Sequence, residues 1–382
     1  IMAAQYWGKQ DAASIEKVIP IALRTNLLFS GLFTILAGFC PEMLMRIFTN
    51  DAALVASGSQ YLRAVALSYV LCGISQVYLI LLKNTGHAAV SSRISSTAVV
   101  LNIIINAILI YGLCGAPALG IRGAAYATVA ARVVELIWAY LETKKPERVR
   151  ILWNRLFSSA GKILSEDFWR YTLPVLAASL VWGIAYVLYS VIMGHMGSDA
   201  VAANSITSIA KSLLSCLIRG VSGGAGVLIG NLLGANELEK AREYGGRLSH
   251  LSIAIGIVTG GLLMLISPAI VHFAPLSDTA AEYLQYMLLF CGLNLMAQSV
   301  NTTVLDGIFC AGGDAKFDMQ GNIGAMWCFS VPLGFLAAFW LKLPVMVVYC
   351  IVNLDEIVKL PAVYHHYKKY IWVRNITRDV ED

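Results

Sequence analysis

The chain has few charged residues: Asp, Glu, Lys and Arg make up 13% of its 382 residues, whereas 58% are hydrophobic. A soluble protein of this length needs more charge to cover its surface. The sequence also lacks a Walker A loop, an HExxH motif and a CxxC pair, so ATP hydrolysis and zinc protease chemistry have no support. The eight cysteines are scattered without metal-ligand or redox spacing. We interpret them as packing residues and expect no bound metal and no organic cofactor.

Long apolar stretches take up most of the chain. Each stretch approaches or exceeds the length of about 20 residues that a helix needs to cross a bilayer core. The alternation of apolar and polar residues that marks β-barrel strands is absent, so the stretches predict helices. The predicted fold class is therefore an all-α membrane protein. The ten predicted spans are 18–40, 61–82, 94–116, 119–141, 171–194, 200–233, 250–273, 283–311, 319–341 and 343–364.

Basic residues are distributed unevenly between the two sides of this predicted topology. One alternating set of inter-helix segments holds most of them, and the other set holds only Arg46, Arg63, Arg122 and Lys342. The positive-inside rule then places both termini of the chain in the cytoplasm, for a multi-pass protein of the cell membrane. The net charge of +5 is explained by this distribution, so we expect the lipid bilayer and no nucleic acid as a partner.

The sequence contains an internal repeat. Gly8 ends an apolar segment and is followed by a charged one, and the same is true of Gly234 in the second half of the chain. Gly86 and Gly313 form a similar pair at almost the same offset. This offset spans six helices, which gives parallel repeats related by an axis along the membrane normal. Because the fifth and sixth spans have no counterpart in this chain, we expect a twelve-helix parent (6+6 repeat) whose first two helices precede residue 1.

The repeat predicts two lobes. Residues 1–141 form an N-terminal lobe of four helices, and residues 171–367 form a C-terminal lobe of six. Residues 142–170 are basic and contain aromatic residues such as Trp153 and Phe157, which predicts a linker lying on the inner leaflet. Residues 368–382 are predicted to be a cytoplasmic tail.

Several segments of the chain resemble the multidrug and toxic compound extrusion (MATE) family in order, spacing and duplication. The resemblance implies export of small, often cationic and amphipathic compounds, driven by inward H⁺ or Na⁺, through rocking of two lobes. It implies no enzymatic activity, and we expect a monomer. Two departures stand out: the acidic residue that many bacterial members carry in their first helix has no counterpart here, and Cys310 stands where many members have Arg. The matching segments are 5–11, 123–128, 230–235 and 311–315.

Polar residues inside the predicted N-terminal lobe are candidates for function, since polar groups in a membrane are costly. Asn102 and Asn106 lie on one helical face, where they resemble the paired polar residues of the fifth family helix. They could help to coordinate Na⁺ or could hold two helices together. Arg132 and Glu135 lie three residues apart on the next helix, which predicts a structural or gating ion pair.

The predicted C-terminal lobe holds the carboxylates that could couple cation and substrate. Gln298, Asn301 and Asp306 lie on one predicted helix, and Asp355 and Glu356 lie on the last one. A carboxylate beside a membrane cavity can bind either a proton or a cationic substrate, which is the minimum that an antiporter needs. Lys359, four residues after Asp355, could instead neutralise that carboxylate in a structural ion pair.

Two alternatives remain beside export of organic cations. A flippase for lipid-linked precursors would have a related fold, but it should place several cationic groups in its cavity. An intramembrane serine protease is suggested only by the GxSxG pattern around Ser222, which lacks the preceding strand or the helical histidine that such chemistry needs. We interpret Ser222 instead as part of a stripe of small residues for helix packing, together with Gly226, Gly230 and Gly234.

Overall fold

A computed structural model describes residues 1–47, 51–151, 153–156 and 161–378. Phe157, which we assigned to the predicted linker, lies outside the described residues. The chain divides into two compact units, which are described one at a time. The N-terminal unit comprises residues 11–168, and the C-terminal unit comprises residues 169–382 together with residues 1–10. The first ten residues therefore pack with the second half of the chain.

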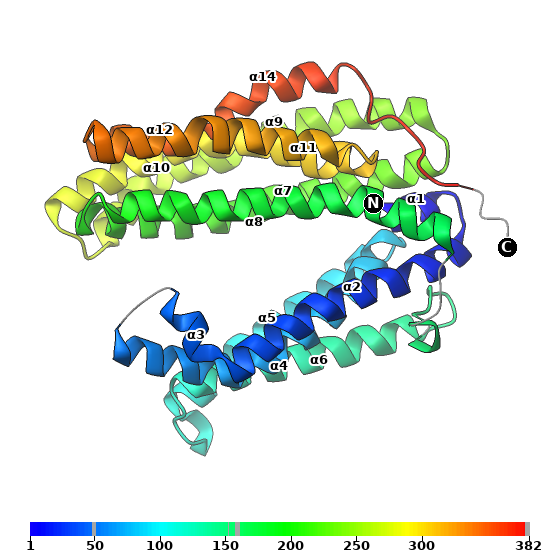
Figure 1. Ribbon diagram of the computed structural model, residues 1–382, viewed down its shortest axis with the longest axis horizontal. Coiled ribbons are helices and arrows are strands. Elements are labelled where there is room, and N and C mark those ends of the chain that lie inside the picture. Colours follow the sequence, from blue (N-terminus) through cyan, green and yellow to red (C-terminus); the bar gives the residue numbers. More distant parts are fainter. Residues whose placement is uncertain (48–50, 152, 157–160, 379–382) are drawn as a thin grey trace. The chain divides into compact units, whose positions relative to one another are not determined.

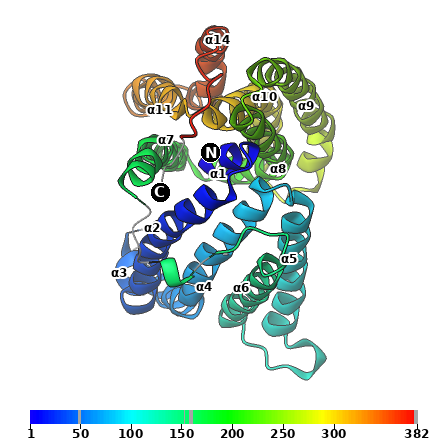
Figure 2. The same cartoon turned by 90° about the vertical axis from the view of Figure 1, so that its right-hand side faces the viewer.

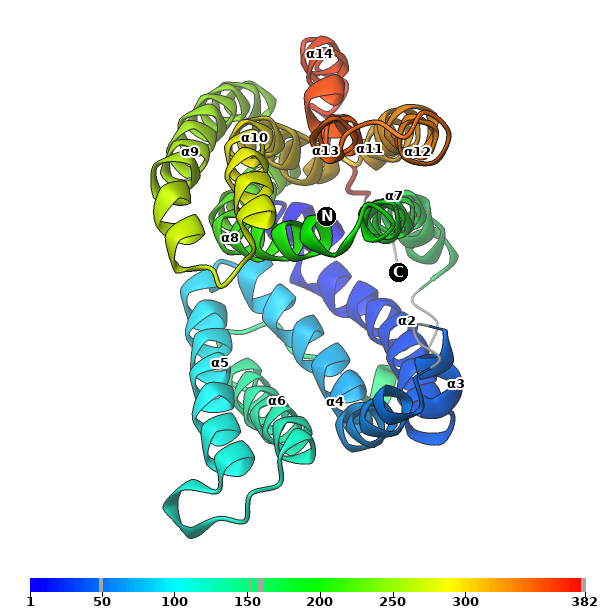
Figure 3. The same cartoon turned by 90° about the vertical axis from the view of Figure 1, so that its left-hand side faces the viewer.

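Two long helices of the N-terminal unit begin at aspartate caps. Asp11 caps the first of them, because its carboxylate accepts a hydrogen bond of 2.9 Å from the backbone N–H of Ser14. Asp51 caps another in the same way, at 2.8 Å from the N–H of Ala53. In space α4 packs between α2 and α6, and α6 packs on α5 (Figure 3). The helices are α2 (Ala12–Phe39), α3 (Pro41–Arg46), α4 (Ala52–Asn84), α5 (Ala88–Tyr111) and α6 (Ile121–Thr143).

The C-terminal unit contains the remaining helices, several of which run side by side along its length (Figure 1). Helix α8 contacts α1, α9 and α10, and the N-terminal α1 lies beside it (Figure 2). Three stretches have the wider π-helical winding: Thr303–Phe309, Ile323–Ser330 and Leu336–Trp340. The α-helices are α1 (Met2–Gly8), α7 (Lys162–Gly194), α8 (Ser198–Gly234), α9 (Leu238–Phe273), α10 (Asp278–Thr302), α11 (Ala315–Asn322), α12 (Val331–Phe335), α13 (Val345–Val352) and α14 (Asp355–Tyr367).

Nine helices in the described part of the chain are long and apolar enough to cross a membrane. They overlap the first nine predicted spans, which confirms an all-helical membrane protein. The tenth predicted span, 343–364, is instead divided into α13 and α14, because the backbone leaves the helix at Asn353 and Leu354. Residues 162–170, which fall in the predicted linker, form the first turns of α7.

Burial differs strongly between the membrane helices. The span formed by α10 and its π-helical extension has 61% of its most apolar window buried, whereas α5 has only 11%. The α10 side chains Leu284, Met287 and Leu295 pack in the main core of the C-terminal unit with Leu263 of α9 and Ile218 of α8. Large apolar side chains on the outer helices remain exposed, as expected for surfaces that contact lipid tails. Helix α10 is thus the central helix of this unit.

Candidate functional site

A polar cavity lies inside the C-terminal unit. It consists of two pockets of about 170 and 370 Å³. Both pockets are lined by Trp182 of α7, Arg219 of α8, Gln298 of α10 and Glu356 of α14, so they form one continuous site. Several acidic and basic side chains line this cavity, and all come from membrane helices or from α14. They are Lys211, Arg219, Asp306, Asp318, Asp355, Glu356 and Lys359.

The break between α13 and α14 opens into this cavity. A break exposes backbone carbonyls that a continuous helix would satisfy, and such a group needs another donor inside a membrane protein. Asn294 of α10 supplies it, donating a hydrogen bond of 2.6 Å to the carbonyl of Asn353. The amide oxygen of Asn294 in turn accepts a hydrogen bond of 2.8 Å from Lys211 of α8. The break is therefore stabilised by side chains from two other helices.

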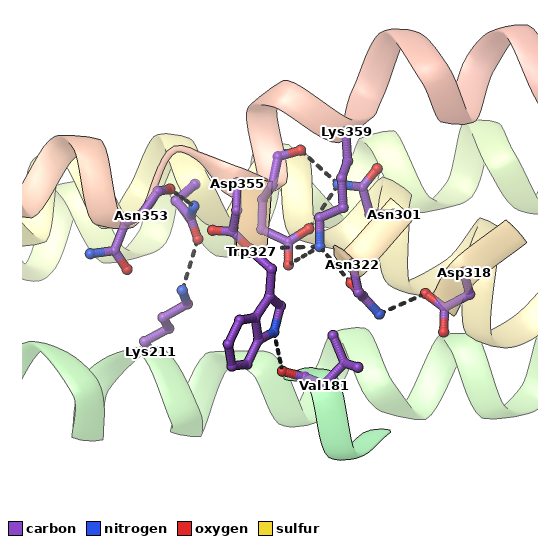
Figure 4. Close-up of polar contacts among 11 residues, drawn as sticks. Val181, Lys211, Asn301, Asp318, Asn322, Trp327, Asn353, Asp355 and Lys359 are labelled. Carbon is purple, nitrogen blue, oxygen red and sulfur yellow. Dashed lines mark hydrogen bonds and ion pairs between the residues drawn. The ribbon is translucent and has the colours of Figure 1, made fainter. Parts of the chain in front are cut away.

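The break also places two carboxylates at the start of a helix. Asp355 and Glu356 occupy the first turn of α14, where the helix dipole favours negative charge. Lys359, one turn later, lies 3.6 Å from Asp355 Oδ2 and 3.3 Å from Glu356 Oε1 (Figure 4). All three side chains are buried. The predicted ion pair of Asp355 and Lys359 is thus a cluster of one cation and two anions.

A chain of hydrogen bonds extends from this cluster to α10 on one side and to α11 on the other. Asn301 of α10 donates to Glu356 Oε2 at 2.7 Å. Lys359 donates to the amide oxygen of Asn322 at 3.2 Å, and Asn322 donates to Asp318 Oδ1 at 3.1 Å (Figure 4). A change of charge at one carboxylate can therefore alter hydrogen bonds on α10, α11 and α14.

Two carboxylates of the larger pocket lie outside any ion pair within the described structure: Asp306 and Asp318. Asp306 lies on the π-helical stretch that continues α10. Such stretches occur mostly as single turns and often mark functional sites. Asp306 was among the predicted site residues, whereas Asp318 was not, because it directly precedes the predicted span 319–341. The polar spacing Asp318 to Asn322, four residues apart, was the available signal.

Lys211 and Arg219 of α8 also line the cavity. Among the described residues neither lies within ion-pair distance of a carboxylate, and the Arg219 guanidinium lies 5.9 Å from the ring centre of Trp182. The cavity wall around them is aromatic, with Tyr186 and Tyr189 beside Trp182. Cations and aromatic rings therefore meet at one end of the site.

The predicted polar residues of the N-terminal unit also contact one another. Asn106 donates to Asn102 at 3.0 Å, and Asn102 donates to the hydroxyl of Thr128 at 3.4 Å. Arg132 forms an ion pair with Glu135 on the same helix. One oxygen of Asn106 and one of Glu135 are buried without a hydrogen-bond partner in the described structure. Asn106 and Glu135 thus each retain one hydrogen-bond acceptor that no described residue occupies.

The predicted stripe of small residues on α8 packs against two helices. The Ser222 hydroxyl donates a hydrogen bond of 2.8 Å to the carbonyl of Thr302 on α10, so this serine is engaged in packing in the interior of a helix. An added methyl group at Gly226 would lie 3.4 Å from the carbonyl of Gly307. At Gly230 and Gly234 it would overlap α1. The GxSxG pattern therefore reflects close helix contact and not a nucleophile elbow.

The contact between α1 and α8 is reciprocal. A methyl group at Gly234 would overlap the carbonyl oxygen of Gln5, and one at Gly8 would overlap the carbonyl oxygen of Asn231. The offset from Gln5 to Asn231 in the sequence equals the offset from Gly8 to Gly234, so the two pairs are equivalent in the repeat. Equivalent residues that exchange partners in this way lie on either side of a two-fold axis. Helix α1 and the end of α8, which are equivalent segments of the repeat, thus pack on each other within the C-terminal unit.

Curated relatives match nearly the whole chain. The uncharacterized transporter YisQ of Bacillus subtilis is 20% identical over 374 residues, which cover 98% of this chain and 82% of the relative. The probable multidrug resistance protein NorM of Agrobacterium fabrum is 22% identical over 347 residues, covering 88% and 74%. The fold is also that of solved structures. A MOP superfamily transporter from Pyrococcus furiosus superimposes with a TM-score of 0.85 at 19% identity, over 97% of this chain and 81% of that one.

A second solved structure, of an outward-facing multidrug resistance MATE family transporter, gives the same TM-score of 0.85 at 19% identity, with the same 97% and 81% coverage. The family model named MatE matches residues 1–108 and 174–336, which together make up most of the chain. The chain therefore belongs to the MatE family of multi-pass membrane transporters.

Proposed function

We propose that the protein is a secondary active antiporter that exports small organic compounds across the cytoplasmic membrane, with the polar cavity of the C-terminal unit as its binding site. Both described chain ends would face the cytoplasm, and the protein would work as a monomer without an organic cofactor. The observation that carries the proposal is the juxtaposition of Asp306 and Asp318, both outside ion pairs in the described part of the chain, with the buried cluster of Asp355, Glu356 and Lys359.

The coupling follows from competition for charge. A cationic compound that enters the cavity is attracted by the carboxylates of Asp306 and Asp318. A proton or Na⁺ that binds one of these carboxylates neutralises that attraction, so binding of one cation disfavours the other. Exchange across the membrane then requires that the cavity open alternately to each side. The names of relatives such as NorM, a probable multidrug resistance protein, support organic compounds as the cargo.

A second candidate is supported by the two cations that line the aromatic end of the cavity. A flippase for lipid-linked precursors, or an exporter of organic anions, needs cationic groups that can pair with phosphate or carboxylate. Lys211 and Arg219 lack carboxylate partners in the described structure and line the same pocket as Trp182, which Arg219 contacts. This reading makes the anionic group of the cargo bind to Lys211 and Arg219, whereas the first reading makes a cationic group bind to Asp306 and Asp318.

The experiment is efflux of the organic cation ethidium from cells that lack their own exporters, with and without Asp306→Asn or Asp318→Asn. We expect efflux by the parent protein to stop when the ion gradient is dissipated and to be lost in both variants. Glu282→Gln, which changes an exposed carboxylate on the same helix α10, is the matched control and should retain efflux. Retention of ethidium by cells that display the parent protein, combined with export of an anionic dye that Lys211→Gln abolishes, would favour the second candidate.

A further inference from the structure

The residues after α14 form a segment that packs onto the end of the C-terminal unit. We name residues 370–378 the C-terminal strap. Its Trp372 is completely buried and stacks on Tyr367 of α14, with ring centres 5.7 Å apart. The indole also fills the space above Gly245 of α9, where an added methyl group would lie 2.6 Å from the ring. Trp372 therefore anchors the strap to α9 and α14 through apolar burial.

The strap next binds the turn that follows α10 and its π-helical extension. Arg374 donates two hydrogen bonds, from Nε to the carbonyl of Gly312 at 2.7 Å and from Nη2 to the carbonyl of Gly313 at 2.6 Å. Carbonyls at the end of a helix lack intrahelical donors, and a guanidinium there also complements the helix dipole. A methyl group at Gly312 would overlap the backbone of Trp372, so the turn and the strap are fitted to each other.

The last residues of the strap hold α1. The backbone N–H of Ile376 donates to the side-chain oxygen of Gln5 at 2.8 Å, and the Gln5 amide donates to the carbonyl of Ala311 at 2.7 Å. Gln5 is completely buried. The carbonyl of Arg378 accepts a hydrogen bond of 3.1 Å from Lys9. The strap is thus anchored at Trp372 and Arg374, and its residues 376–378 hold α1.

The strap also reaches α8. Asn375 donates a hydrogen bond of 3.3 Å to the carbonyl of Gly234, the last residue of that helix. Gly234 is also the residue whose Cα packs on the backbone of Gln5. One short segment of the C-terminal unit is therefore bonded to α1, to the end of α8 and to the turn that follows the π-helical extension of α10.

We propose that the C-terminal strap is a latch for the cytoplasmic ends of α1 and α8, and that the latch must release before these ends can separate. The inference rests on the proposed function, because an antiporter must open its cavity alternately to each side, and we assign the cytoplasmic opening to separation of α1 from α8. While the latch is closed, Gln5 bridges the strap and the turn at Ala311. Release breaks the bonds of Gln5 and Lys9 but leaves the Trp372 anchor in place.

The test measures opening directly and does not depend on transport. Cys310, partly buried and directly before Ala311, serves as the reporter once the other cysteines are replaced. The rate of its alkylation by a water-soluble maleimide is measured in inside-out vesicles. Two variants weaken the latch: Gln5→Leu, and a chain that ends after Asn375. We expect alkylation to be about tenfold faster in each, because each variant removes the buried hydrogen bond between Ile376 and Gln5.

Lys369→Gln is the matched control, because Lys369 is exposed and lies directly before the strap. It should leave the rate unchanged. Equal alkylation rates in the parent and in both latch variants, with the same elution profile on size exclusion, would overturn the proposal.

A second arm uses Gln5→Cys with Ile376→Cys, joined by a short bifunctional thiol crosslinker. Ethidium efflux should stop on crosslinking and return after cleavage of the linker, and efflux that continues with the crosslink intact would contradict the latch. If the parent protein exports nothing, the proposed function fails while the alkylation rates still decide the inference.

Discussion

At the residue scale, the cavity depends on how its charges are paired. Lys359 neutralises two carboxylates at once and has a further acceptor in Asn322. A buried ion pair is weak support for stability as such, because the desolvation of both charges offsets their attraction. Its chemical significance is that protonation of Asp355 or Glu356 removes one of the two negative charges beside Lys359. The cluster is therefore a place where cation binding can be converted into rearranged contacts.

Replacement of Lys359 by Gln is expected to lower the free energy of unfolding by about 3–5 kcal/mol, because Asp355 and Glu356 then stay buried without a cation. The double variant Glu356→Gln with Lys359→Gln should lose clearly less than the sum of the two single variants. Thermal unfolding in detergent measures all three. Additive losses would mean that the two side chains do not interact in the folded protein.

At the element scale, the helix break at Asn353 is the feature that the sequence did not predict. Residues 343–364 are apolar enough to be assigned one continuous span, and local composition contains no Gly or Pro at the break. The break is stabilised from outside by Asn294, which is distant in sequence. Hydropathy predicted the long membrane helices well, because their length and apolar character are local properties. Contacts between distant polar residues are not local, and this is also why Asp318 was missed.

The break predicts a specific effect of Asn294→Leu. This change removes the donor to the Asn353 carbonyl and the acceptor for Lys211. Loss of a buried hydrogen bond that leaves a carbonyl unsatisfied costs about 1–3 kcal/mol. We therefore expect lower thermal stability together with lower ethidium efflux.

Gln285→Leu is the control on the same helix, since Gln285 bonds to Ser267 of α9 and does not line the cavity. It should lose stability and retain efflux. Equal loss of efflux in both variants would show that α10 tolerates no polar change and that the break has no special role.

At the scale of the whole molecule, the internal repeat explains where helices must approach closely. The offset between the copies was readable from the sequence, but the sequence alone could not show that Gly8 and Gly234 approach reciprocal partners. In the structure Gly8 approaches the backbone of Asn231, and Gly234 approaches the backbone of Gln5. Gln5 and Asn231 are themselves equivalent residues of the repeat. Close contact of this kind lets two helix ends meet without side chains between them. The strap then closes over the same contact.

The reciprocal contact between α1 and α8 predicts how glycine substitutions change the stability of the protein. Gly8→Ala and Gly234→Ala should each lower stability by about 1–3 kcal/mol, because each new methyl group overlaps a backbone carbonyl that cannot move alone. The double variant should lose less than the sum, since the first substitution already forces α1 away from α8. Gly224→Ala on α8 is the control: an added methyl group there meets no atom within 4 Å, so stability should hold or rise by up to about 1 kcal/mol. A neutral Gly8→Ala beside a destabilising Gly234→Ala, measured by thermal unfolding, would show that the two contacts are not equivalent and that the repeat is not matched at this axis.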